Sequence, residues 1–285
     1  MPTHTSTIRH SQFAIRNPLI LITNDDGITS PGLRAAVRAA LPLGEPLVVA
    51  PDQQWSGAGR SMPPGTKGCI SRVPLEIDGQ PVTAYQANAS PALAVAHALL
   101  ELVPRRPALL ISGINYGENL GTDVTISGTV GAALQAANHG IPALAASLQT
   151  PKETHINPSD SVDFTATIHF TRLVARRLLA TLLPFDVDLL KLDVPSDATL
   201  ETPWRLTRVS RHTYFVPIPP QRSDLAEPMR FDYTRLAHPE RTEPDSDIYA
   251  LMVDRVVSVA PLTLDLTSRV ESREVEALLR GPTIL

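Results

Sequence analysis

Short apolar segments alternate with longer segments of helical periodicity between residue 18 and about residue 200. Five near-continuous apolar runs have the length of strands, at residues 19–23, 47–51, 108–112, 142–148 and 189–195. Runs without polar alternation are typical of strands that are covered on both faces, as in a parallel sheet. The pattern therefore predicts a sheet with helices packed on both sides.

The predicted helices lie between these strands and carry apolar residues every three to four positions. The first follows Ser30 as its N-cap, with Pro31 at the first helical position. Its apolar face consists of Leu33, Ala36, Val37 and Ala40. Further helices are predicted over residues 91–103, 127–139 and about 160–183. Alternating strands and helices imply right-handed crossovers, so we expect an α/β protein with a doubly wound, mainly parallel sheet.

The character of the chain changes after about residue 200. Prolines crowd residues 216–220, and acids and arginines are scattered through residues 221–247 with little periodicity. A strand at residues 254–262 follows. The chain closes with a short helix, for which Ser268 and Glu271 form a candidate capping box.

We therefore expect three regions. Residues 1–17 are predicted to be a disordered tail, residues 18–200 to form the core, and residues 201–285 to form a C-terminal extension of β-hairpins and loops, with a returning strand and a terminal helix. Several apolar residues of the extension lie among prolines, which prevent them from forming a compact core; they are Trp204, Tyr214, Phe215, Val216 and Ile218. A second subunit is the expected cover, which predicts a homo-dimer or tetramer. The alternative is a lid over the chain's own sheet.

Charge and cysteine content exclude several kinds of partner and of metal site. A net charge of -4 gives no general basic surface, so neither a nucleic-acid polymer nor a membrane is an expected partner. No apolar run approaches the roughly 20 residues of a membrane span. The single cysteine, Cys69, excludes an internal disulfide and a cysteine-based zinc site. This usage suits a reducing compartment, and we expect a cytoplasmic protein.

An acid pair, Asp25-Asp26, directly follows the first predicted strand. In an open α/β sheet, ligands bind beyond the carboxyl ends of the strands. Ser30 already supplies the cap of the next helix, so neither acid is needed there. Two adjacent carboxylates become favourable when a hard divalent cation neutralises them. The pair is therefore a candidate metal site.

Two further strand ends supply oxygen ligands. Residues 52–61 form a polar loop with Ser56 at its centre, and residues 113–123 carry Asn115 and Asn119. Either loop alone is weak evidence, since such residues commonly just form turns. Together with the acids they offer carboxylate, hydroxyl and amide oxygens. This donor set favours Mg²⁺ or Mn²⁺ over zinc.

An anion site is predicted where the helix at residues 127–139 begins. Ser127, Gly128 and Thr129 precede the helix, so free backbone N–H groups and two hydroxyls are expected to face outward at the positive end of its dipole. Phosphate is the usual occupant of such a site. A phosphate cradle beside an oxygen-ligated cation is suited to phosphoryl hydrolysis, in which the metal polarises the phosphoryl oxygen and activates a water.

Four ordered segments resemble the signature blocks of the SurE family. They are ILITNDDGITSPGL (20–33), VVAPDQQWSGAGRS (48–61), SGINYGENLGTDVTISGTVGAA (112–133) and GIPALAASL (140–148). The resemblance implies a Rossmann-like core and a metal-dependent 5′/3′-nucleotidase acting on nucleoside monophosphates. It also implies one divalent cation per subunit and hairpins exchanged between subunits.

Residue by residue, the resemblance implies a specific site. The family's metal ligands fall on Asp25, Asp26, Ser56 and Asn115. Its phosphate contacts fall on Ser127, Gly128 and Thr129, with Asn119 close by. The residues assigned to catalysis are Asp25, Asp26 and Asn115. Candidates for a base pocket are Arg60, Tyr116, Tyr214 and Phe215.

Other classes of protein fit less well. The first strand is not followed by the G-x-G-x-x-G of a dinucleotide-binding fold, and no G-x-S-x-G is present for a serine nucleophile. A haloacid-type phosphatase with an aspartate nucleophile stays open, although its acids are spaced D-x-D. A non-catalytic nucleotide- or metal-binding module also stays open, because its ligands would look the same.

Overall fold

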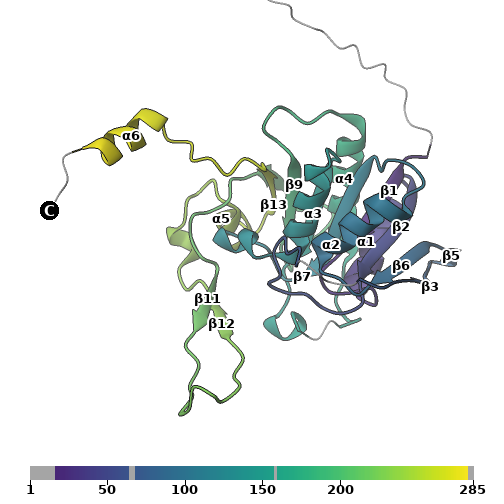
Figure 1. Cartoon of the computed structure of the whole chain (residues 1–285), viewed down its shortest axis with the longest axis horizontal. Helices are drawn as coiled ribbons and strands as arrows, with labels where there is room; N and C mark the ends of the chain where they lie inside the picture. Colours follow the sequence, from purple (N-terminus) through teal and green to yellow (C-terminus); the bar gives the residue numbers. More distant parts are fainter. Residues whose placement is uncertain (1–16, 64–67, 157–158, 282–285) are drawn as a thin grey trace, which may run out of the picture.

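The computed structural model describes residues 17–63, 68–156 and 159–281. A nine-stranded sheet runs through the described part of the chain in the order β10-β13-β9-β8-β7-β1-β2-β6-β3 (Figure 1). Its strands are β1 (Leu19–Thr23), β2 (Glu45–Pro51), β3 (Ile70–Val73), β6 (Thr83–Ala87), β7 (Leu109–Tyr116), β8 (Ala143–Leu148), β9 (Leu189–Val194), β10 (Trp204–Leu206) and β13 (Val257–Leu262). Two small antiparallel pairs are β4 (Glu76–Ile77) with β5 (Gln80–Pro81), and β11 (Phe215–Ile218) with β12 (Asp232–Arg235).

The centre of the sheet is parallel. Strand β1 pairs in parallel with both β2 and β7, and the chain builds β2 and β6 on one side before crossing to β7, β8 and β9 on the other. Only the outer strands β3 and β13 pair antiparallel within the sheet that the structure describes. The predicted doubly wound, mainly parallel α/β fold is confirmed. The strand order reverses between β1 and β7, where ligands bind in folds of this type.

The helices are α1 (Pro31–Ala40), α2 (Pro91–His97), α3 (Gly128–Asn138), α4 (Thr165–Ala180), α5 (Asp247–Met252) and α6 (Ser272–Arg280). Both faces of the sheet are covered by helices, but α6 extends away from it and has no buried residue (Figure 1). Short segments of other helix types are Ala98–Leu102, Thr122–Thr125, Lys152–Thr154 and Pro239–Arg241. Helices α1 and α4 share one buried cluster with one face of the strands, and α2 and α3 share a second cluster with the opposite face.

The hydrophobic pattern predicted the core well. All four residues of the expected face of α1 are buried, and so are Val130, Ala133 and Ala137 of α3. Apolar side chains on both faces of β1 are fully or almost fully buried, because a helical layer covers each face. The continuous apolar runs therefore have the physical cause inferred from the sequence.

Several predicted boundaries were wrong. The strand predicted over residues 108–112 extends to Tyr116, so Asn115 lies within β7 rather than in the loop after it. Helix α4 starts at Thr165 rather than near residue 160, and the strand expected from residue 254 starts at Val257. The capping box of the terminal helix is absent: Glu271 occupies the N-cap of α6, with no side-chain hydrogen bond to the helix. The tail predicted over residues 1–17 lies outside the described residues except for Asn17.

The C-terminal extension forms a small hydrophobic core together with the loop after β7. Leu120, Tyr214, Ile248 and Leu251 are fully buried together, with Phe215, Leu236 and Met252 packed against them. Tyr214 was expected in an exposed apolar patch, and the structure contradicts this. Helix α5 and the loop after β7 cover its ring, so prolines nearby did not prevent local packing.

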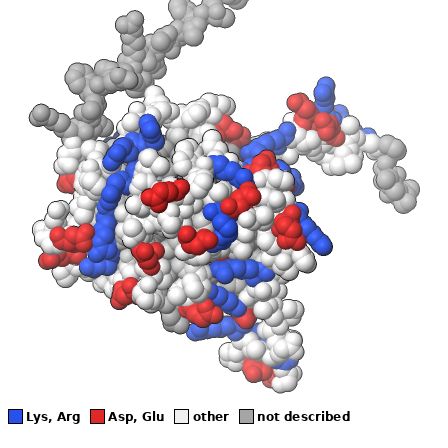
Figure 2. Space-filling view, turned by 180° about the vertical axis from the view of Figure 1, so that it is seen from behind, with Lys and Arg blue, Asp and Glu red and all other residues white. Residues whose placement is uncertain are grey.

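Surface charge is mixed rather than segregated. On the face shown in Figure 2, basic and acidic side chains lie interspersed among uncharged residues. Among the described residues, no helix is long and apolar enough to cross a membrane.

Candidate active site

The loops after β1 and β2 meet the end of β7 at the point where the strand order reverses. A cleft of about 400 Å³ opens there. It is lined by Asp25, Ser56, Gly57, Asn115, Tyr116, Gly117, Glu118, Asn119, Asp123, Ile126, Ser127, His155, Phe215, Phe231 and Tyr233. The fold thus brings together residues that are far apart in the sequence, and it includes most of those predicted for the site.

Asp25 lies at the floor of the cleft and is only 4% exposed. Burial raises the pKa of its carboxyl to about 6, although hydrogen bonds from the Thr129 hydroxyl and from the backbone at Gly128 and Thr129 oppose the rise. Thr129 Oγ1 donates to Asp25 Oδ1 over 2.5 Å. A Cβ atom on Gly128 would lie 2.8 Å from Asp25 Cβ, so glycine permits this close approach.

This contact corrects one expectation. The hydroxyl of Thr129 was expected to face outward toward phosphate, but it is buried and donates to Asp25. The first turn of α3 therefore directs donors at the acid of the cleft floor. A negative carboxylate at a helix N-terminus is favourable for the same reason that phosphate is.

Asp26 is oriented differently from its neighbour. Its Oδ2 accepts a hydrogen bond from the backbone N–H of Tyr116 at 3.2 Å, and its Oδ1 accepts one from Gln54 Nε2 at 3.3 Å. It lines an adjacent pocket of about 300 Å³ with Gln54 and Asp160 rather than the main cleft. Burial and the charge of Asp25 raise its pKa to about 8. Asp25 and Asp26 are thus both buried, and no cationic side chain of the described residues forms an ion pair with either of them.

Asn115 reaches the cleft from a distorted part of β7. The pairing of β7 with β8 shifts register between Ser112 and Asn115, at Gly113, whose φ is 129°. A Cβ atom on Gly113 would lie 2.2 Å from the carbonyl oxygen of Ala146, so only glycine fits this approach. The amide nitrogen of Asn115 donates to the carbonyl of Gly117 at 2.6 Å, which leaves its Oδ1 as a candidate ligand atom.

The donor set fits a hard divalent cation. Asp25, Ser56 and Asn115 line one cleft, and Asp26 is the next residue along the chain from Asp25. In the described part of the chain, no three His, Cys, Asp or Glu side chains form a metal-binding group. A cation here would therefore depend on two acids and neutral oxygens, which suits Mg²⁺ or Mn²⁺. Burial raises the pKa values of both acids, and a nearby positive charge would favour their ionised forms.

The remaining predicted phosphate residues have structural partners as well. Ser127 lines the cleft, and its Oγ accepts from the backbone N–H of Val130 as the N-cap of α3. Asn119 also lines the cleft; its amide nitrogen donates to Ser147 Oγ at 2.8 Å and its backbone N–H to Asp193 Oδ1 at 2.7 Å. Both side chains are held in fixed positions at the edge of the cleft.

Asp193, which accepts the backbone N–H of Asn119, belongs to a buried ion cluster. Lys191 pairs with Asp193 and, at 3.2 Å, with Asp247 Oδ2, and all three side chains have no exposed surface. Asp247 also accepts from the backbone N–H of Gly121. The cluster therefore ties β9, α5 and the loop after β7 together beneath the cleft.

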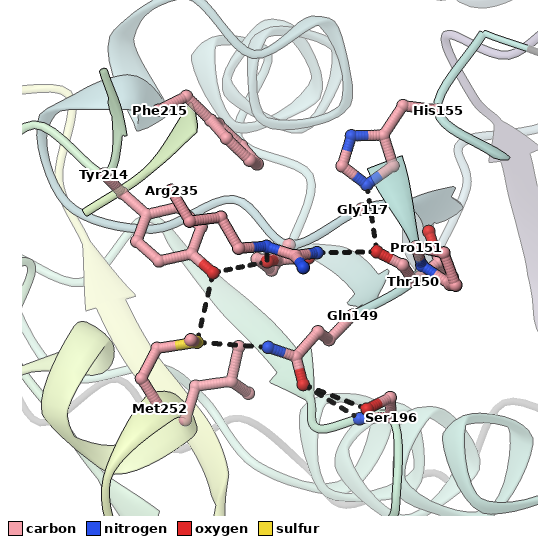
Figure 3. A network of polar contacts seen from close by, with 12 residues as sticks. Gly117, Gln149, Thr150, Pro151, His155, Ser196, Tyr214, Phe215, Arg235 and Met252 are labelled. Carbon is pink, nitrogen blue, oxygen red and sulfur yellow. Dashed lines mark hydrogen bonds and ion pairs between the residues drawn. The ribbon is translucent and has the colours of Figure 1, made fainter. Parts of the chain in front are cut away.

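A polar network that the sequence did not reveal connects the cleft loop to the β11–β12 hairpin (Figure 3). Glu118 has a fully buried side chain, and its Oε1 accepts from Arg235 Nε at 2.8 Å and from the hydroxyl of Tyr214 at 2.5 Å. Arg235 also donates to the carbonyl of Thr150 at 2.6 Å. Asp123 accepts the backbone N–H groups of Tyr214 and Phe215.

Aromatic residues form the outer wall of the cleft. Phe215, Phe231 and Tyr233 come from the hairpin, and His155 lies beside them. Of the predicted base-pocket residues, Tyr116 and Phe215 line the cleft. Tyr214 is buried behind it. Arg60 does not line it and instead donates to Gln135 Oε1 at 2.9 Å.

His155 is not free to act as a base. Its Nε2 donates to the carbonyl of Thr150 at 3.2 Å, so its Nδ1 is left to accept the hydroxyl of Tyr233 at 2.7 Å. Burial lowers the pKa of this histidine, which favours the neutral ring. Among the cleft residues that the structure describes, no serine has a histidine partner of the kind that activates a nucleophile.

The fold and cleft define an α/β protein with an oxygen-lined, acidic ligand site at the switch point of its sheet. A family model described as "Survival protein SurE" matches residues 20–215, and the chain belongs to the SurE family. It is 40% identical to the 5′-nucleotidase SurE of Thermococcus gammatolerans over 93% of this chain and 97% of that protein. The 5′-nucleotidase SurE of Thermococcus kodakarensis is 39% identical over 91% and 98% of the two chains.

The fold comparison agrees with the sequence comparison. The crystal structure of the SurE protein from Aquifex aeolicus matches with a TM-score of 0.72 at 28% identity. The match covers 92% of this chain and all of that chain, so it includes the C-terminal extension as well as the sheet.

Proposed function

We propose that the protein is a 5′-nucleotidase, a phosphoric monoester hydrolase that converts nucleoside 5′-monophosphates to nucleoside and phosphate, and that it also accepts 3′-monophosphates. Family membership supports this proposal, as do relatives of 36–40% identity that are named 5′-nucleotidases. The observation that carries it is the cleft itself. The same cleft is lined by a buried acid with amide and hydroxyl groups and by aromatic rings.

The reaction is proposed to depend on one Mg²⁺ or Mn²⁺ ion per subunit. Asp25, Asp26, Ser56 and Asn115 would hold it, and the raised pKa values of the two acids support this assignment. The ion would supply Lewis-acid polarisation of the phosphoryl group and a lowered pKa for the attacking water.

The chain's own residues would position the substrate. Ser127 and Asn119 line the cleft and would donate to phosphoryl oxygens, and their hydrogen bonds to Val130 and Ser147 support this role by holding both side chains in place. The N–H groups at the start of α3 and the hydroxyl of Thr129 hold the carboxylate of Asp25 in one orientation. No covalent intermediate on the protein is proposed, because no activated nucleophile was found among the described cleft residues.

Release of inorganic phosphate from 5′- and 3′-adenosine monophosphate, measured with Mn²⁺ and again with EDTA, tests the proposal. We expect turnover that EDTA abolishes and Mn²⁺ or Mg²⁺ restores. Full activity in the chelator would overturn the metal-dependent mechanism. A phosphoryl adduct detected on the chain by mass spectrometry would favour an aspartate nucleophile instead. Binding of nucleotide without phosphate release would favour the non-catalytic module.

Assembly and location are also proposed. We infer a homo-dimer or tetramer, with the C-terminal extension at the interface, and no nucleic-acid polymer or membrane as partner. Mixed charge on the described surface supports the second part (Figure 2). A cytoplasmic location is supported by one exposed, unpaired cysteine, Cys69.

A further inference from the structure

We propose that Phe231, together with Phe215 and Tyr233, forms a stacking platform for the nucleobase and thereby sets the preference for nucleotides over base-free phosphate esters. This inference rests on the proposed function and names the part of the substrate that the hairpin would recognise. Phe231 lines the same cleft as Asp25, and the sequence did not point to it.

The cleft combines two kinds of lining that suit a nucleotide. Asp25, Asn115 and Ser127 contribute carboxylate, amide and hydroxyl groups, and Phe215 and Phe231 contribute aromatic rings to the same cleft. A phosphate ester of a base-bearing sugar has two matching parts, an anionic phosphate and a flat aromatic base. Stacking on an aromatic side chain accepts any base, because every base has a π-face.

Within this wall, Phe231 is the ring most available to a ligand. It is 78% exposed although it lines the cleft. Phe215 makes edge contacts with Tyr214, Tyr233 and His155, with ring centroids 4.8, 5.0 and 5.8 Å apart. Phe231 takes part in none of the ring pairs of the described residues. A large apolar ring left in solvent at the rim of a cleft is a candidate ligand contact.

Tyr233 supports the wall more than it offers a free face. The Lys152 ammonium lies 4.7 Å from the centroid of its ring, and its hydroxyl donates to His155 Nδ1. The His155 ring is nearly parallel to it, with centroids 6.1 Å apart. These contacts fix Tyr233, and through the chain they fix the start of β12, which follows directly from Phe231.

The platform is attached to the chemical end of the cleft by buried contacts. Glu118, on the same loop as Asn119, accepts hydrogen bonds from Arg235 and Tyr214. Asp123 accepts the backbone N–H of Phe215 at 2.7 Å. Both strands of the hairpin are thus fixed relative to the loop that carries Asn119. A site built this way is preorganised, so little order has to be gained when a ligand binds.

The test compares two substrates that differ only in the base: adenosine 5′-monophosphate and ribose 5-phosphate. In the wild type we expect kcat/KM to favour the nucleotide. In Phe231→Ala this preference should fall about tenfold, the size expected for loss of one stacking contact. Hydrolysis of ribose 5-phosphate should fall much less, because this substrate has no base to stack. Phe231→Trp should keep the preference, and Phe185→Ala, which removes a fully exposed ring elsewhere, is the matched control.

A binding measurement separates this inference from the proposed function. Titration calorimetry with adenosine and with ribose requires no hydrolysis. We expect adenosine to bind more tightly than ribose to the wild type and to lose that advantage in Phe231→Ala. Equal binding of adenosine and ribose would overturn the platform even if nucleotides are hydrolysed. Base-dependent binding without hydrolysis would support the platform and count against the nucleotidase.

The mass of each variant in solution provides the last check. If Phe231→Ala changed the oligomeric state and left the preference for the nucleotide unaltered, Phe231 would be an interface residue and the platform would be refuted.

Discussion

At the scale of single residues, the acid pair is the most informative feature of the molecule. Asp25 and Asp26 are both almost fully buried, and neither has a cationic side-chain partner among the described residues. Burying two uncompensated carboxylates is unfavourable, and each acid responds with a raised pKa. This cost is understandable if a divalent cation is the missing partner.

We predict that Asp25→Asn and Asp26→Asn each lose most hydrolytic activity while the fold is kept. Each substitution removes a charged group proposed to bind the cation, and losing several kcal/mol of metal-assisted stabilisation would correspond to a rate reduction on the order of 100-fold or more. Rates at saturating Mn²⁺ measure this. Asp78→Asn, at an exposed surface pair with Arg38, is the control. Because Asp26 faces the neighbouring pocket, normal activity of Asp26→Asn alone would remove it from the ligand set.

The same acids predict how the stability of the metal-free protein depends on pH. Their folded pKa values, about 6 and about 8, lie above the ordinary 3.8, so the folded state binds more protons than the unfolded state between about pH 4 and pH 8. The free energy of unfolding must therefore fall as pH rises through this window. Thermal melts in EDTA should show the fall, and Mn²⁺ at pH 8 should reverse it.

Asp26→Asn isolates the contribution of one group. Asp193 also has a raised pKa, about 6, and contributes in the same direction. The variant keeps that contribution but cannot ionise at position 26, so its metal-free form should be more stable than the wild type at pH 8. A difference between the two proteins that does not grow from pH 5 to pH 8 would contradict the assignment.

The helix caps were predicted correctly from the sequence, because a cap depends on the residues next to it in the chain. Ser30 caps α1 and Ser127 caps α3, because both stand directly before a periodic apolar segment. Thr129 was misjudged because its partner, Asp25, is more than 100 positions away. No local signal shows that a hydroxyl in a first helical turn points at a strand end.

At the scale of elements, the β11–β12 hairpin shows why tertiary contacts are hard to infer. Its strands are four residues each, and their exposure pattern does not alternate regularly along β11. The hairpin is stabilised instead by Glu118 and Asp123, which belong to the loop after β7. The central strands were predictable because each is buried on both faces, whereas the hairpin depends on partners distant in sequence.

We predict that Arg235→Met destabilises the protein by about 2–4 kcal/mol, because it leaves the buried carboxylate of Glu118 without its cation. Urea unfolding measures the change. The double variant Glu118→Gln, Arg235→Met should recover part of the loss, since the amide carries no charge. Arg208→Met, which removes an exposed pair with Asp245, is the control and should change stability little. Equal stability of Arg235→Met and wild type would show that the pair contributes nothing.

At the scale of the whole molecule, many solvent-exposed apolar side chains lie in the C-terminal extension, outside the core of the sheet. Figure 1 shows the β11–β12 hairpin and α6 extending from the body of the molecule. Exposed apolar residues gather there: Ile218, Leu225 and Met229 on the hairpin, and Val275, Leu278 and Leu279 on α6. Trp204 and Leu206 are exposed on β10, at the edge of the sheet.

Such surface is unusual for a monomer, and we predict a homo-dimer or tetramer at micromolar concentration. Helix α6 has no buried residue, so within one chain it lacks the packing that normally stabilises a helix of nine residues. Light scattering coupled to size exclusion gives the mass. The variant Leu278→Glu, Leu279→Glu should reduce it, whereas Arg273→Glu on the same helix should reduce it less, because charged side chains contribute little to an apolar contact. A monomeric wild type would refute the assembly and leave α6 without a partner.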